Sequence, residues 1–336
     1  KSSNQDSTLA RVGDTIIIKF KGDELLTNQS ATILLNNGNI DSDNSEANII
    51  YYAKHVLQGD DIEGEVNFEI IVTDSVGIES NPVIETTNAS SVIFDRTLPV
   101  ISHLHIESNN NNDTSIGISG DEIFLTFSSS ELLQIDSIFV NISGQSVSTI
   151  NSGDNFTSSY ILNGDEPSGN ISYILDYQDL AGNQGVQLDS TQDSSYVKHD
   201  LIPPEIINCY ISSNNPDSSW AKEGDSVFVT FISSEPLSNI EVNIENTLSS
   251  IMQVNSTKYI AYLIMDNNHA QGQIPFLISY TDLGGIPGED INSTTNASII
   301  KYDNQSPNIN NILTKTNNIY GDSLAGIGTI DTLKFS

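Results

Sequence analysis

The chain has 336 residues and is strongly acidic, with 12 lysines and arginines against 44 aspartates and glutamates and a formal net charge of -32. Such a charge repels phosphate backbones and anionic lipid headgroups, which excludes nucleic-acid binding. No apolar run reaches the roughly 18 residues of a membrane span, so we expect no membrane insertion in this segment. Self-repulsion of this size needs screening by salt or bound cations, which predicts a saline or calcium-rich, extracellular setting.

The first repeated element is a strand that begins at a small residue followed by aspartate. VGDTIIIKF at 12–20 matches SGDEIFLTF at 119–127 and EGDSVFVTF at 223–231, and TIDTLKFS at 329–336 begins a fourth copy, so the period is about 105 residues. Apolar residues alternate along these segments, as in a strand with one buried face. We therefore expect the columns of Ile16, Ile18 and Phe20 to point into a core.

A second strand in each copy ends at an aspartate. Glu24, Glu131 and Glu235 follow the strand described above in the three copies, and a small-residue turn comes later, at Gly64, Gly169 and Gly272. FEIIVTD, YILDYQD and FLISYTD then end at Asp74, Asp179 and Asp282. Their alternation predicts a second core strand in each copy.

Each copy closes with a short tag in which an aspartate precedes a proline by four residues, as in FDRTLP at 94–99, HDLIPP at 199–204 and YDNQSP at 302–307. Proline cannot donate to a strand ladder and biases the preceding residue to extended geometry. The tag is therefore predicted to be the joint at which one domain ends and the next begins.

Short alternating strands, frequent polar turns and units of about 100 residues predict an all-β fold of tandem immunoglobulin-like Greek-key β-sandwiches in a linear array. The predicted domains are residues 1–97, which lack the first strand, then 98–202 and 203–305, and the start of a fourth at 306–336. Because the chain begins and ends inside repeats, we expect it to be a segment of a longer protein.

The motifs resemble those of bacterial and archaeal Ig-like tandem repeats, whose units run from an SNN stretch and a GD strand through SSE to a D-x-AGN turn and a D-x-T-x-P joint. Here these elements read ESNNNN, SGDEIFLTF, SSSEL, YQDLAGNQG and FDRTLP, and the resemblance covers nearly the whole chain. It implies giant adhesins, surface-layer proteins or other cell-surface fibres, commonly with calcium at turns and joints. Only the second unit keeps the turn asparagine, Asn183, and only the first joint keeps the threonine, Thr97.

Calcium takes six to eight oxygen ligands, so a site needs two or three acidic side chains brought together by loops. The turn after the sixth strand of a sandwich and the exit to the next domain both lie at a pole, which makes two columns of aspartates candidate ligands. The candidates are Asp95, Asp200 and Asp303 at the joints, and Asp74, Asp179 and Asp282 with Asn183 at the turns. The alternative is that these aspartates only cap turns through hydrogen bonds to the backbone.

Other polar residues receive structural interpretations. Glu24, Glu131 and Glu235 are lower-ranked ligands, and Asp14, Asp121 and Asp225 are assigned to strand-entry turns. Cys209 occupies an apolar column and is predicted to be buried, whereas His103 and His105 are predicted to face solvent and Trp220 to cover an end of its sandwich. No catalytic motif is present, so we expect no enzymatic activity.

The sequence therefore predicts a non-enzymatic structural segment of a long extracellular protein. Its tandem modules are expected to form a rod-like stalk, filament or surface-layer lattice, with copies of itself or neighbouring repeats as partners. Two alternatives remain: a carbohydrate-binding or spacer region of a secreted hydrolase, with surface glycans as partners, and the stalk of an adhesin whose binding tip lies elsewhere. Aromatic patches on exposed faces would favour the carbohydrate-binding alternative.

Overall fold

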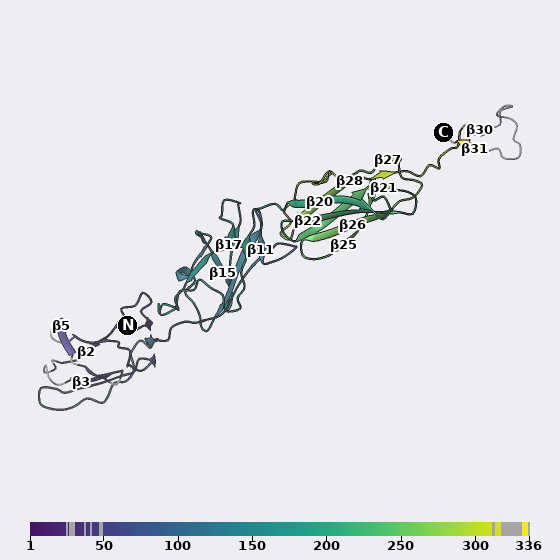
Figure 1. Ribbon diagram of the computed structural model, residues 1–336. Helices are drawn as coiled ribbons and strands as arrows, with labels where there is room; N and C mark the ends of the chain where they lie inside the picture. Colours follow the sequence, from purple (N-terminus) through teal and green to yellow (C-terminus); the bar gives the residue numbers. More distant parts are fainter. Residues whose placement is uncertain are drawn as a thin grey trace. The chain divides into compact units, whose positions relative to one another are not determined.

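The computed structural model describes residues 1–24, 26, 31–36, 38–40, 42–46, 50–310, 313–316 and 331–334, and side chains for 1–24, 26, 35–36 and 50–310. Over these residues the chain is built of strands, and the one helical element is the single 3-10 turn Ile135–Ser137. No helix among them is therefore long and apolar enough to cross a membrane. The chain divides into two compact units, Lys1–Leu201 and Ile202–Ser336 (Figure 1).

The second repeat, in the first unit, shows the sandwich most fully. One antiparallel sheet has the order β10 (Ile101–Ser108), β12 (Glu122–Ser129), β16 (Asn155–Ile161) and β15 (Thr149–Ser152). A second has the order β14 (Gln145–Val147), β13 (Phe139–Ile142) and β18 (Tyr173–Asp176). These orders correspond to the A-B-E-D and C'-C-F sheets of an immunoglobulin-type sandwich. A short third sheet joins β11 (Ile116–Gly117), β19 (Lys198–His199) and β17 (Gly169–Asn170).

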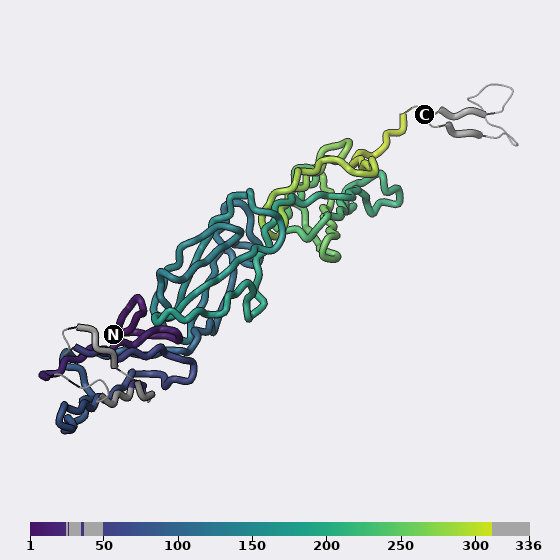
Figure 2. Tube along the Cα trace, turned by 90° about the vertical axis from the view of Figure 1, so that its left-hand side faces the viewer, coloured from purple at the N-terminus to yellow at the C-terminus, as the bar shows by residue number. Residues whose placement is uncertain are grey.

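The third repeat, in the second unit, has the same topology. Its large sheet has the order β20 (Ile206–Ser213), β22 (Ser226–Ser233), β26 (Lys258–Ile264) and β25 (Ser250–Gln253). The second sheet has the order β24 (Thr247–Leu248), β23 (Leu237–Ile244) and β28 (Phe276–Asp282), and the short sheet joins β21 (Trp220–Ala221), β29 (Lys301–Tyr302) and β27 (Gly272–Gln273). Figure 2 shows the chain of each of these two repeats folding back and forth along its module.

The first repeat follows the same plan over its described residues. Its large sheet has the order β2 (Thr15–Lys21), β6 (Ile50–Val56) and β5 (Ser42–Glu46). The second sheet has the order β4 (Gly38–Ile40), β3 (Ala31–Leu35) and β8 (Phe68–Val72). The short sheet joins β1 (Leu9–Ala10), β9 (Ile93–Phe94) and β7 (Gly64–Glu65). Ser2 bridges to Ile16 as Ser108 pairs with Ile123 in the second repeat, so the first repeat has the end of an opening strand. An antiparallel pair, β30 (Leu313–Thr316) and β31 (Asp331–Lys334), lies in the predicted fourth repeat, whose other residues beyond 310 lie outside the described part.

The predicted all-β, immunoglobulin-like fold is confirmed, and each hydrophobic core lies within one repeat. The predicted inward columns are buried in the second and third repeats, at Ile123, Leu125 and Phe127 and at Val227, Val229 and Phe231. Cys209 has no exposed surface and its burial raises the pKa of the thiol to about 11, which confirms its assignment to the core. Thr230, which alternates with these core positions along β22, is also buried. The division between the two units lies one residue from the predicted boundary at 202/203.

The strand-entry aspartates cap turns, as predicted. Asp121 Oδ2 accepts hydrogen bonds from the Ile118 backbone N–H at 2.9 Å and from Asn110 Nδ2 at 2.8 Å. Asp14 and Asp225 receive the same two bonds, from Arg11 and Asn4 and from Lys222 and Asn215. The asparagine of the SNN stretch therefore has a structural role in all three repeats: it ties the opening strand to the turn before the next one.

A tyrosine ring and a glycine form a matched pair near the end of the second core strand. A Cβ added to Gly185 would lie 2.1 Å from Cε2 of Tyr177, and one added to Gly288 would lie 2.1 Å from Cε2 of Tyr280. In both repeats the glycine N–H donates to the tyrosine carbonyl at 3.0 Å. The first repeat has Val72 and Ser80 at these places, with the same backbone bond at 2.8 Å.

We expect Gly185→Ala to destabilise the first unit by about 1–3 kcal/mol, because the added methyl group overlaps the Tyr177 ring and forces overpacking. Thermal unfolding followed by near-UV circular dichroism measures the effect. The double variant Tyr177→Val/Gly185→Ser, which installs the pair of the first repeat, should recover part of the loss. A Gly185→Ala protein as stable as the wild type would contradict this account of the pair.

Candidate metal centre

The joint aspartate is fixed where the chain leaves each sandwich. The backbone N–H of Asp95 donates to Ala10 O at 2.8 Å, continuing the parallel pairing of β1 with β9. Asp200 and Asp303 make the same bond, to Gly117 O and Ala221 O, each at 2.9 Å. The side chain of Asp95 turns back along the tag, where Oδ1 accepts the Thr97 N–H at 2.9 Å. The carboxylate is therefore held at one pole of the first repeat.

The turn aspartate of the second repeat reaches that pole from the other side. Asp179 is 1% exposed; its Oδ1 accepts the backbone N–H of Asn183 and its Oδ2 accepts Asn183 Nδ2, both at 2.8 Å. The same amide donates to the carbonyl of Asp95 at 3.1 Å. Within the first unit, the turn of the second repeat is thus bonded to the exit of the first.

Three carboxylates converge at this joint. Asp95, Glu131 and Asp179 each offer one oxygen, and these oxygens all lie within 4.8 Å of one another. Glu131 follows β12 directly, so the second repeat contributes two of the three and the first repeat contributes Asp95. The structure therefore brings together the joint and turn columns singled out from the sequence, and it adds Glu131, which the sequence ranked lower.

A fourth carboxylate, Glu63, was missed by the sequence analysis. Its Oε1 accepts the hydroxyl of Thr97 at 2.8 Å and the backbone N–H groups of Thr97 and Arg96 at 3.1 Å each. These bonds, led by that from the Thr97 hydroxyl, lower the pKa of Glu63 to about 2. No repeat signal pointed to it, because Ser168 and Gln271 stand at its place in the other repeats.

Negative charge accumulates at the joint. Burial, followed by the carboxylates of Asp95, Asp179 and Glu63, raises the pKa of Glu131. Burial is also the main cause of the raised pKa of Asp95, and Glu63 and Asp179 add to it. The guanidinium of Arg96 donates to the carbonyl of Gly59 and pairs with Glu63, at 3.8 Å from Nε to Oε2. One buried and two half-buried carboxylates with converging oxygens are a donor set that fits a hard divalent cation such as calcium.

The second unit repeats half of this arrangement within itself. A carboxylate oxygen of Glu235 lies within 4.8 Å of one of Asp282, which is 1% exposed. Asp282 Oδ1 accepts the N–H groups of Gly285 and Ile286 at 2.7 and 2.8 Å, but its buried Oδ2 has no partner among the described residues. Ile286 stands where the second repeat has Asn183, so no side-chain amide reaches that oxygen. Asp200 belongs to the first unit, where Lys198 Nζ lies 3.0 Å from its Oδ2.

Two of the predicted metal ligands are seen only as turn caps. Asp74 Oδ1 accepts the backbone N–H groups of Val76 and Ile78 at 2.9 and 2.8 Å. Asp303 is exposed, and its Oδ1 accepts the N–H of Gln305 at 2.9 Å. Over the described side chains, neither aspartate belongs to a group of three possible ligands. Both aspartates cap turns, and their assignment as metal ligands stays a prediction.

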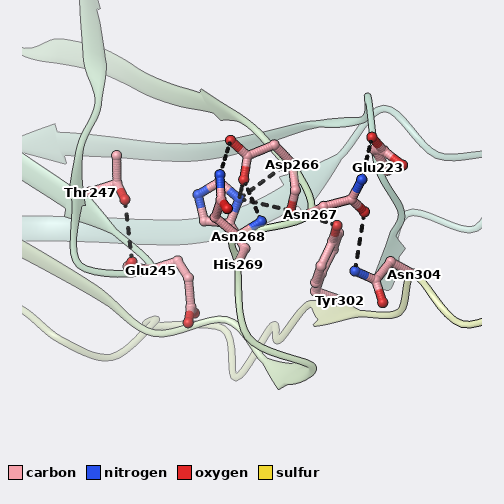
Figure 3. A network of polar contacts seen from close by, with 9 residues as sticks. All are labelled: Glu223, Glu245, Thr247, Asp266, Asn267, Asn268, His269, Tyr302 and Asn304. Atoms are coloured by element: carbon pink, nitrogen blue, oxygen red, sulfur yellow. Dashed lines mark hydrogen bonds and ion pairs between the residues drawn. The ribbon is translucent and has the colours of Figure 1, made fainter.

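The exit of the third repeat is occupied by an amide network (Figure 3). Asn267 donates to Glu223 Oε1 at 2.8 Å and accepts from Asn304 Nδ2 at 3.4 Å, and the Tyr302 hydroxyl donates to Asp266 O at 2.7 Å. His269 Nδ1 accepts the backbone N–H of Asp266 at 2.9 Å. Asn304 stands at the place of Arg96 and Gln271 at the place of Glu63, so amides replace that ion pair at this exit.

The remaining singled-out residues lie away from the carboxylate cluster. His103 is exposed, and the ring of His105 stacks on it at 6.1 Å while its Nδ1 lies 2.6 Å from Asp193 Oδ2. Trp220 is 40% exposed, and Lys301 Nζ lies 5.6 Å from the centre of one of its rings. Neither place gathers three possible metal ligands among the side chains described.

Comparisons with known proteins return distant structural matches. No protein-family model matches the sequence, and no curated protein matches it significantly. Fibronectin(III)-like modules of CbhA from Clostridium thermocellum are 12% identical, with 60% of this chain and 94% of that chain covered and a TM-score of 0.28. A marsupial T cell receptor is 8% identical, with 87% and 98% covered and a TM-score of 0.35. SGBP-B of the Bacteroides ovatus mixed-linkage glucan utilization locus, in complex with a heptasaccharide, is 13% identical, with 94% and 67% covered and a TM-score of 0.20. Likenesses this low carry no inference about function.

In metal-free buffer at neutral pH, Glu131→Gln should raise the melting temperature of the first unit. Ionised Glu131 costs stability because its pKa in the folded chain is raised above its ordinary value of 4.5. That cost is complete above the folded pKa and disappears below the ordinary value, so the gain should vanish as the pH falls toward 4. Each kcal/mol relieved is worth roughly 2–4 °C for a unit of this size.

Calorimetry from pH 7 to pH 4 with chelator measures this difference. The matched control is Asp165→Asn, which removes an exposed carboxylate of the same repeat outside the cluster and should leave the melting temperature unchanged. A Glu131→Gln protein that is less stable than the wild type in chelator would mean that the carboxylates at the joint do not repel one another.

Proposed function

We propose that this chain is a non-enzymatic structural segment of a long extracellular protein, related to the Ig-like repeats of prokaryotic cell-surface fibres. Its tandem sandwiches would form a stalk, filament or surface lattice whose joints are stiffened by calcium. The observation that supports this most directly is the cluster of Asp95, Glu131 and Asp179, because it is assembled from the exit of one repeat and two loops of the next.

The residues at the first joint act as a clamp in this proposal. Asp95, Glu131 and Asp179 would hold the cation, while the Nδ2 of Asn183 ties Asp179 to the carbonyl of Asp95. Glu63 holds the tag in place through Thr97 and Arg96. Bound calcium supplies positive charge that offsets the repulsion among these carboxylates and cross-links the two repeats. Without it, the joint keeps only hydrogen bonds such as that from Asn183 to Asp95 O.

The composition supports an extracellular role of this kind. A net charge of -32 makes a long chain of such modules dependent on screening, which seawater-like or calcium-rich surroundings provide. The acidic columns recur in the third repeat as Glu235 and Asp282, and the unpartnered Oδ2 of Asp282 is a buried acceptor that a cation would satisfy. The carboxylates are therefore arranged for repetition along the chain rather than for one catalytic centre.

The carbohydrate-binding alternative has one observation in its favour, the exposed indole of Trp220. Aromatic rings bind sugars by stacking on their faces, but Lys301 Nζ lies over the Trp220 ring, 5.6 Å from a ring centre. The ammonium group occupies one of the two faces, which leaves a smaller platform. We therefore favour the structural role.

Calcium should raise the melting temperature of the wild-type chain, and chelator should reverse the change. At a free calcium concentration about 100 times the Kd, binding to the folded form contributes about 2.7 kcal/mol. For the first unit this corresponds to a rise of roughly 5–10 °C. Calorimetry with calcium and, separately, with magnesium measures the shift, and isothermal titration gives the stoichiometry.

Asp179→Asn and Glu131→Gln should each reduce the calcium shift of the first unit strongly, because each removes a charged ligand. Asp165→Asn should keep the full shift. An unchanged melting temperature of the wild type between millimolar calcium and chelator would refute the calcium clamp. An equal shift in all three variants would place the bound ion elsewhere on the acidic surface.

A further inference from the structure

The outer face of the large sheet of the third repeat is rich in large apolar side chains, and the strand residues that form it include no carboxylate. The residues that alternate with the core positions on β20, β22, β26 and β25 are Asn208, Tyr210 and Ser212; Ser226, Phe228, Thr230 and Ile232; Lys258, Ile260, Tyr262 and Ile264; and Ser250 and Met252. We call these residues the outer face. Met252 is 53% exposed, Ile264 59% and Tyr262 39%.

The strand register places the large side chains next to one another. Phe228 pairs with Tyr262 across β22 and β26, and their rings lie 6.3 Å apart. In the next row Tyr210 pairs with Thr230, Thr230 with Ile260, and Ile260 with Met252. Thr230 is buried beneath these neighbours although it lies on the outside of the sheet. The apolar residues therefore occupy neighbouring positions on all four strands of this sheet, which Figure 1 labels in the second unit.

The second repeat has the same sheet with a more polar outer face, so the number of apolar residues in the patch is not a requirement of the fold. Tyr210, Ile232, Ile260 and Tyr262 stand where the second repeat has His105, Ser128, Thr157 and Ser159. Ser212 and Ser226 replace its two carboxylates, Glu107 and Glu122. On this face the third repeat therefore has more apolar side chains and fewer carboxylates than the second repeat, whereas the buried sides of the two sheets share one pattern.

We propose that the outer face of the third repeat binds the same face of a second copy of this chain. Two chains of net charge -32 repel each other over most of their surfaces, so close approach is least costly where carboxylates are absent. Enrichment in Tyr, Phe and Met with depletion of charge is the composition of a protein–protein interface core. This inference rests on the proposed structural role and names one of its lateral contacts.

The size of the face makes the contact weak by itself. Four strands about 4.8 Å apart and three rows about 6.8 Å apart cover roughly 400 Å² on each copy, or about 800 Å² in a face-to-face pair. Stable interfaces bury about 1,200 Å² or more. Isolated chains should therefore pair reversibly at high concentration, and a repeated array of such faces would hold through many simultaneous contacts.

A neutral glycan is less suited to this face than a second copy. Ile232, Ile260, Ile264 and Met252 are aliphatic and lie between and beside the rings, so they offer no hydrogen bonds to sugar hydroxyls. Apolar side chains of an identical face would bury them fully.

The test is sedimentation velocity of the whole chain from micromolar to near-millimolar concentration, in chelator and again in calcium. The wild type should shift toward twice the monomer mass, and more so at higher salt, which screens the repulsion. Met252→Asp should weaken the association at least roughly tenfold, since each copy then brings a carboxylate to the contact. The control is Ile150→Asp, at the matching edge-strand position of the second repeat, where Ile150 is 71% exposed.

A second variant introduces the residues of the second repeat and should be monomeric; it carries Tyr210→His, Ile232→Ser, Ile260→Thr and Tyr262→Ser. The single Met252→Asp change at an exposed site guards against misfolding of this fourfold variant. A wild type that stays monomeric at every salt concentration overturns the proposal, as does equal weakening by Met252→Asp and Ile150→Asp. So does a neutral gluco-hexaose that binds the wild type but not Met252→Asp while the chain stays monomeric. Because pairing is also measured in chelator, the test of this face does not depend on whether the first joint binds calcium.

Discussion

The backbone hydrogen bond that each joint aspartate donates to a short parallel strand is the constraint on which the first joint depends. Asp95 N–H bonded to Ala10 O ends the last strand of its repeat at a fixed place, so the carboxylate beyond it has a fixed position as well. The loops carrying Glu131 and Asp179 then meet a group whose place is set by the preceding core. A flexible linker would offer no such position, and the carboxylates would separate until their repulsion was screened.

The buried side of the large sheet is constrained by core packing and the outer side is not, which explains why the repeats resemble one another mainly on the buried side. The inward columns must fill a core of similar size, so Ile123, Leu125 and Phe127 recur as Val227, Val229 and Phe231. The outward columns face away from that core and vary: one matching position carries Lys21, Ser128 and Ile232 in the three repeats. A module of this kind can change its surface chemistry at little cost to its stability.

Periodicity predicted the strands and the buried Cys209, because these features repeat or follow from alternation. It marked Asp95 and Asp179 as candidates in two columns but did not say which joint meets which turn. It could not predict Glu63, which occurs at that place in one repeat only and acts through contacts with Thr97 that are 34 residues away along the chain. The role of Glu131 depends on where a loop lies at the pole, and spacing alone does not fix that. The repeat aligns Asp74 with Asp179 and Asp303 with Asp95, so it offered turn capping as an alternative for all of them and singled out neither of these two.

The residue at the position of Asn183 determines whether the buried turn aspartate has a hydrogen-bond donor within the chain. Asn183 satisfies Asp179 Oδ2 with its amide, whereas Ile286 leaves Asp282 Oδ2 buried without a partner among the described residues. A buried acceptor left in this state costs about 1–3 kcal/mol. A cation near Glu235 and Asp282 would remove that cost, while the turn of the second repeat is already satisfied within the chain. The turn of the third repeat therefore has more to gain from calcium than the turn that best matches the family motif.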